Sequence, residues 1–143
     1  MNPEDIARVR RGFAKISADR RAFSVKFYDA LFQIEPSLRP LFKGDLATHG
    51  DIFVTSLGVA VGALENLNAV ADRLRDDGRR IAKIGIENRH YAVAAEALLD
   101  AVESSLGDHF DQRDRVAWAT AYAQWADITS GAADTSGISA AGA

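Results

Sequence analysis

The sequence contains no cysteine, only three histidines and a single methionine. Without cysteine the chain has no disulfide, iron–sulfur cluster, thiolate metal site or cysteine nucleophile. It also lacks the residue that would indicate a redox compartment. A function that depends on a metal must therefore rest on very few donor side chains.

Excess charge and long hydrophobic runs are also lacking. The formal net charge is −3, which argues against a nucleic-acid-binding protein. The least polar run covers residues 52–64 and is too short to span a bilayer. The acidic N-terminus lacks the basic and then apolar pattern of a signal peptide. We therefore expect a soluble, cytoplasmic protein that binds neither nucleic acid nor membrane.

Proline occurs only at positions 3, 36 and 40, so most of the chain is free of the residue that breaks helices. Apolar residues recur at helical spacing, and no segment alternates as a strand would. The pattern predicts six main helices, over about 3–17, 19–35, 47–65, 69–83, 89–106 and 112–130, with a short helical turn after Pro36. The length predicts one all-α domain over residues 1–131. Residues 132–143, mainly glycine, alanine, serine and threonine, are expected to form a flexible tail.

Signatures of catalysis are missing as well. The sequence has no glycine-rich phosphate loop, no His-Glu-x-x-His pair and no Gly-x-Ser-x-Gly turn. Its carboxylates are scattered over polar helix faces, which is typical of solvated charges. We do not expect an enzyme from these residues.

The most informative segment runs from Phe27 to Phe42, with the sequence FYDALFQIEPSLRPLF. It resembles the second and third helices of bacterial single-domain globins, the type found in flavohaemoglobins and related to neuroglobin. The resemblance continues at 57–61, 89–91, 96–99 and 117–122, and it covers about residues 4–130. It implies the globin fold, a three-over-three sandwich of six to eight helices, and it implies haem that binds oxygen or another diatomic gas.

On the distal side of the implied haem, the resemblance covers four residues. Tyr28 matches the tyrosine whose hydroxyl bonds a gas ligand, and Phe42 matches the phenylalanine that packs against the haem ring. His49 matches a position that relatives fill with glutamine or histidine, and Phe53 would cover the same cavity. Without haem, all four are core positions.

On the proximal side, the pattern fails at the residue that matters most. Ile86 and Tyr91 match lining positions, and Arg80 matches a basic residue near a haem propionate. The histidine that holds the iron should follow Arg80, but the sequence has Ile81, and an alkyl side chain cannot donate to iron. The glutamate that supports this histidine in some relatives is matched by Ala133.

Few donors remain for the metal, and His49 and Tyr28 could instead serve as hydrogen-bond donors to a bound gas. His90 lies on the next predicted helix and is a poor substitute for the missing histidine. Haem iron can be held by histidine or tyrosine, and only His49 and Tyr28 are expected to face the pocket. Haem would therefore bind with His49 as its non-standard axial ligand.

Two interpretations stay open. The first is a haem protein that carries or senses a diatomic gas. The second is a haem-free globin fold that acts as an interaction or sensor module, with its pocket filled by Ile81 and Phe53 or by a fatty acid or other apolar ligand. An enzyme such as a nitric-oxide dioxygenase is the weakest interpretation, because it needs a redox-competent haem. The chain could also form a homodimer, because symmetric dimers are the commonest oligomers of soluble proteins.

Overall fold

The computed structural model describes the backbone of residues 1–142 and the side chains of residues 1–131. This part of the chain is helical and contains no strand, so the predicted all-α class is confirmed. Within it, no helix has both the length and the apolar character needed to cross a membrane. The α-helices are α1 (Pro3–Ala18), α2 (Arg20–Ile34), α3 (Leu46–Gly62), α4 (Ala71–Ile84), α5 (Asn88–Leu106) and α6 (Gln112–Gly142), and the 3₁₀ helices are η1 (Pro36–Leu41), η2 (Leu67–Val70) and η3 (Gly107–His109).

Polar side chains set where several helices begin. Asn2 accepts a hydrogen bond from the backbone N–H of Asp5, and Asp19 and Asp45 cap α2 and α3 in the same way. Such caps satisfy backbone donors that have no partner inside the helix. At α5 the cap includes a histidine side chain. Asn88 is the first helical residue, Glu87 is the N-cap, and Nδ1 of His90 accepts from the Glu87 backbone N–H at 2.9 Å.

The end of α6 also differs from expectation. The sequence predicted a helix end near residue 130, whereas the helical backbone continues to Gly142. This stretch has no proline, and alanine, which is frequent in it, is the strongest helix former. The side chains of residues 132–143 lie outside the described part of the chain, so the flexible tail predicted there stays a prediction.

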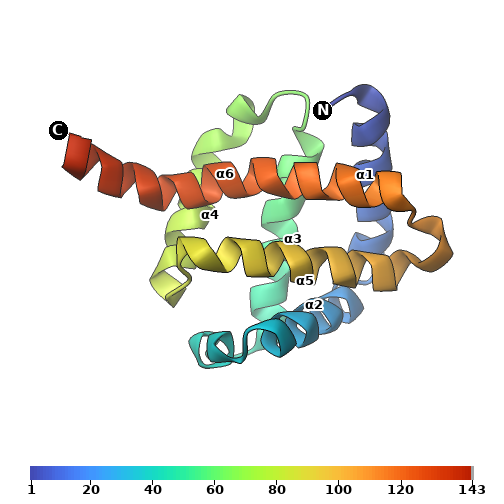
Figure 1. Cartoon of the computed structure of the whole chain (residues 1–143), viewed down its shortest axis with the longest axis horizontal. Helices are drawn as coiled ribbons and strands as arrows, with labels where there is room; N and C mark the ends of the chain where they lie inside the picture. Colours follow the sequence, from blue (N-terminus) through green and yellow to red (C-terminus); the bar gives the residue numbers. More distant parts are fainter. Residues whose placement is uncertain (143) are drawn as a thin grey trace.

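The helices form two crossing sets (Figure 1). α5 and α6 run side by side across one face of the molecule, and α1, α3 and α4 cross behind them. α6 contacts α4, α5 and α1, while α2 contacts both α5 and α3. Phe23 and Phe27 on one side of α2 and Tyr28 on another are all buried. This arrangement leaves a partly open space between α2, α3, α4, α5 and α6.

Close helix contacts fix the position of α4. A Cβ atom on Gly78 would overlap the carbonyl oxygen of Thr129 in α6. Thr129 is itself fully buried, and its hydroxyl donates to the carbonyl of Trp125 at 3.1 Å. Interiors packed this densely transmit displacements rather than absorb them. α4 is therefore held directly against α6, and this places Asp77 and Ile81 at the edge of the partly open space.

Candidate functional site

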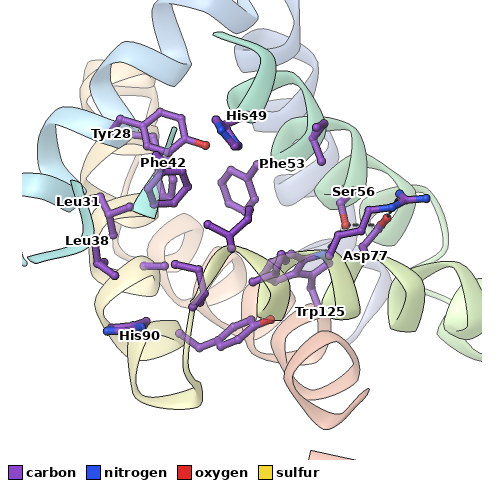
Figure 2. A pocket seen from close by; sticks show the side chains of 18 of the residues that line it. Tyr28, Leu31, Leu38, Phe42, His49, Phe53, Ser56, Asp77, His90 and Trp125 are labelled. Atoms are coloured by element: carbon purple, nitrogen blue, oxygen red, sulfur yellow. Dashed lines mark hydrogen bonds and ion pairs between the residues drawn. The ribbon is translucent and has the colours of Figure 1, made fainter. Parts of the chain in front are cut away.

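A cavity of about 250 Å³ lies between α2, α3, α4, α5 and α6 (Figure 2). Nearly all of its wall is apolar, with a few polar groups at defined points. The structure brings all eight side chains that the sequence singled out to this wall: Tyr28, Phe42, His49, Phe53, Arg80, Ile81, Ile86 and Tyr91. Their binding roles stay predictions. An apolar pocket with a few convergent polar groups is the usual form of a small-molecule site.

Tyr28 brings a polar atom to this wall from α2. The side chain is buried, and burial raises the pKa of its phenol above the ordinary value of 10. Its hydroxyl points toward the ring of His49 (Figure 2), and no hydrogen bond joins it to any described residue. Its ring contacts Phe42 edge-on, with 5.3 Å between the centroids. Tyr28 therefore presents a protonated, unpaired hydroxyl at the cavity.

His49 lies in the first turns of α3 and is half-buried. Its Nε2 is 2.8 Å from the carbonyl oxygen of Lys43. A carbonyl only accepts hydrogen bonds, so Nε2 must carry the hydrogen and the lone pair of the neutral ring is on Nδ1. The ring stands edge-on to Phe42 at 5.4 Å. In this arrangement Nε2 is committed to the backbone and is not free to bind a metal.

The α4 side of the cavity offers no donor at the expected position. Ile81 and Ile84 face the cavity from α4, and Ile86 follows just after it. His90 is also at the wall, but its Nδ1 accepts from the Glu87 N–H. The neutral ring therefore carries its hydrogen on Nε2, which is buried without a partner. Among the described residues, no cluster of three or more His, Cys, Asp or Glu side chains could hold a metal.

A buried polar group that sequence reasoning missed joins three helices. Ser56 of α3 donates to Oδ2 of Asp77 in α4 at 2.7 Å, and Nε1 of Trp125 in α6 donates to the Ser56 oxygen at 3.0 Å. All three side chains are buried. The only sequence signal was the helical spacing of Ser56 with His49 and Phe53. Asp77, in a charged helix, gave none.

Arg80 lies at the cavity wall with most of its side chain in solvent. Its NH1 is 3.4 Å from Oδ1 of Asp77, and the Nε of Arg73 is 3.6 Å from the same oxygen. Both arginines therefore form ion pairs with the buried carboxylate of Asp77. The role expected for Arg80, pairing with a haem propionate, would have to compete with this contact.

Trp125 is the second feature that sequence reasoning did not assign to the site. Its indole ring meets Phe53 of α3 edge-on at 5.6 Å and tilts against Tyr122 at 5.3 Å and Tyr91 at 5.9 Å. The hydroxyl of Tyr122 donates to the carbonyl of Tyr91 at 2.8 Å, and burial raises the pKa of this phenol. The aromatic spacing in α6 was visible in the sequence, but its contact with α3 was not.

Comparisons with known proteins agree with this architecture. The globin family model matches residues 25–128. The chain is 24% identical to neuroglobin of Danio rerio, with 85% of this chain and 86% of that protein covered. It is 28% identical to a flavohemoprotein of Rhizobium meliloti over 73% of this chain but 27% of that protein. A bacterial globin structure from Campylobacter jejuni superposes with a TM-score of 0.82 at 18% identity, covering 94% of this chain and 97% of that one. The predicted globin fold is confirmed, and the protein belongs to the globin family.

Proposed function

We propose that this globin binds a small, mainly apolar ligand in its cavity and does not hold a haem iron there. The observation that carries the proposal is Ile81 on the cavity wall. A site that held iron from α4 would need a nitrogen, sulfur or oxygen donor at this point. The isoleucine instead extends an apolar surface that continues through Ile84 and Ile86.

The other donors near the cavity do not fit a haem iron as they stand. Nε2 of His49 bonds to the Lys43 carbonyl, and Nδ1 of His90 accepts the Glu87 N–H. Both Tyr28 and Tyr122 stay protonated, because burial raises the pKa of each phenol. The Nε2 atom of His49, the His90 ring and the two phenols would each have to give up a hydrogen bond or a proton before donating to iron, and only Nδ1 of His49 keeps a free lone pair.

The same wall suits an apolar molecule. Removing apolar surface from water stabilises a complex by about 25 cal/mol per Å² before the cost of association is subtracted. A few polar groups then fix the ligand's orientation. The unpaired hydroxyl of Tyr28 is the group in a position to do this, because it lies at the cavity and bonds to no described residue.

Haem with a bound diatomic gas, held by His49, is the second candidate. The observation that favours it is the place of the His49 ring, which lines the cavity, faces the Tyr28 hydroxyl and stands edge-on to Phe42. Rotation of this ring would exchange one hydrogen bond to Lys43 for iron ligation. The relatives include proteins named neuroglobin and flavohemoprotein.

An absorbance titration with haemin separates the two candidates. It uses the wild-type protein, His49→Ala and the control His109→Ala, which changes an exposed histidine of η3. We expect no saturable Soret band in any of the three. In parallel, toluene should raise the melting temperature of the wild type. A stoichiometric Soret band that His49→Ala abolishes and His109→Ala retains would instead establish the second candidate.

A further inference from the structure

We infer that Trp125 sets the upper size limit of the ligand, so that the cavity admits a single aromatic ring or a short alkyl chain and excludes larger flat molecules. This inference rests on the proposed function and narrows its ligand class. It assigns a specificity-determining role to a residue of α6 that is far in sequence from the cavity residues of α2 and α3. Four observations support it.

The first observation is that Trp125 of α6 closes one side of the cavity by direct contact with Phe53 of α3. Its ring meets Phe53 at 5.6 Å between centroids. Phe53 cannot retreat toward α2, because it stacks on Phe27 at 4.6 Å. Phe27 is itself buried. The walls formed by α3 and α6 therefore touch, and no flat ligand passes between them while both rings keep their positions.

The second observation is that the indole is fixed. Trp125 is 2% exposed, and its Nε1–H donates to Ser56 at 3.0 Å. Ser56 is held in turn by Asp77 at 2.7 Å. Swinging the indole away would leave a buried donor without a partner, which is unfavourable. A ligand that displaces Trp125 therefore binds less tightly than one that leaves it in place.

The third observation is the volume that remains. The cavity measures about 250 Å³. Apolar cavities of about 150 Å³ bind benzene, and pockets for drug-sized molecules begin near about 300 Å³. The space therefore suits toluene, phenol or a short alkyl chain. A tetrapyrrole is several times larger than benzene, so most of its ring would lie outside this volume unless the wall rearranged.

The fourth observation is that the space for a ligand and the donor for a metal depend on two different residues. Ile81 and Trp125 lie on different helices, α4 and α6, and both line the cavity. Replacing Ile81 with histidine supplies a metal donor but leaves the contact between Trp125 and Phe53 in place. Restoring the donor alone should not admit haem, whereas restoring donor and space together should.

The test measures the binding of toluene, naphthalene and haemin to a set of variants. Trp125→Leu opens the wall. Trp118→Leu is the matched control, because Trp118 is 1% exposed, lies in the same helix and does not line the cavity. Trp125→Phe is a milder change in case the leucine variant does not fold. Melting-temperature shifts report toluene and naphthalene, and the Soret band reports haemin in Ile81→His with and without Trp125→Leu.

We expect the wild type to bind toluene and not naphthalene. Trp125→Leu should bind naphthalene about 10- to 100-fold more tightly than the wild type does, since the additional ring carbons become buried. Trp118→Leu should show no such gain. Ile81→His should take up haemin stoichiometrically only in combination with Trp125→Leu, or more weakly with Trp125→Phe.

Different results overturn different claims. Toluene binding by the wild type without any gain of naphthalene binding in Trp125→Leu and Trp125→Phe would overturn the role of Trp125 alone. An equal gain in Trp118→Leu, or stoichiometric haemin uptake by Ile81→His alone, would overturn it as well. No binding of toluene by the wild type would overturn the proposed function, while the haemin results would still decide whether Trp125 closes the cavity.

Discussion

The hydroxyl of Ser56 donates a hydrogen bond of 2.7 Å to Oδ2 of Asp77, and this bond joins α3 to α4 inside the protein. The hydroxyl oxygen of Ser56 also accepts the indole N–H of Trp125 at 3.0 Å. One hydroxyl thus satisfies a buried acceptor and a buried donor on two other helices. The arrangement ties the polar interior of this globin to the aromatic wall of its cavity.

Ser56→Ala should destabilise the protein by about 2–4 kcal/mol. The change leaves both Asp77 and Trp125 without the partner each has in Ser56, and each unpaired buried group typically costs about 1–3 kcal/mol. Urea unfolding at neutral pH measures the loss. Ser104→Ala, at an exposed site in the same kind of element, should stay within about 0.5 kcal/mol of wild type. Equal stability of the two variants would show that the buried bonds contribute nothing.

Gly78→Ala should be far more damaging than Gly62→Ala. A Cβ on Gly78 overlaps the carbonyl of Thr129, whereas a Cβ on Gly62 meets no atom within 4 Å. We expect a loss of about 3 kcal/mol or more at Gly78, because α4 must move away from α6. At Gly62 we expect a gain of up to about 1 kcal/mol. Thermal and urea unfolding of the pair check both signs, and a tolerated alanine at Gly78 would contradict the close α4–α6 contact.

Tyr28→Phe should change ligand preference more than stability. The hydroxyl bonds to no described residue, so its removal should alter the free energy of unfolding by less than about 1 kcal/mol. Affinity for phenol should fall about 5- to 10-fold, the effect of one lost hydrogen bond. Affinity for toluene, which forms no such bond, should stay the same. A parallel fall for both ligands would mean that the ring, and not the hydroxyl, contributes to binding.

The ion pair between Arg10 of α1 and Glu65, just after α3, should contribute stability that depends on pH. NH1 of Arg10 donates to Glu65 at 2.8 Å, and this hydrogen bond lowers the pKa of Glu65 from 4.5 to about 2. A carboxyl with a lowered pKa in the folded state stabilises that state above its unfolded pKa. The contribution should therefore be complete above about pH 4.5 and should be lost as the pH falls toward 2.

Glu65→Gln tests this dependence. Urea unfolding of the variant should vary less between pH 5 and pH 2 than that of the wild type. Glu96→Gln is the control, because Glu96 is an exposed residue of α5 that has no ion pair among the described residues. It should follow the wild-type profile more closely than Glu65→Gln does. Identical profiles for all three proteins would contradict the inferred pKa of Glu65.

Much of the site was predictable because its residues follow local patterns. Tyr28 and Phe42 belong to one short segment, and His49 and Phe53 lie one turn apart on α3, so the resemblance placed them together. The hydrogen bonding of the His49 ring, and hence its tautomer, was not predictable. Its hydrogen bond to Lys43 depends on the path of the chain between η1 and α3, and that path decides which ring nitrogen carries the hydrogen.

The sequence by itself determined the helices, through apolar periodicity and prolines confined to positions 3, 36 and 40, and it determined that Ile81 gives the cavity no metal donor. These are local or chemical facts, which do not depend on the rest of the fold. Only the tertiary structure decided that Ser56, Asp77 and Trp125 meet and that Trp125 touches Phe53. Those contacts join three separate helices, and their geometry depends on how α3, α4 and α6 pack against one another, which no periodic pattern encodes.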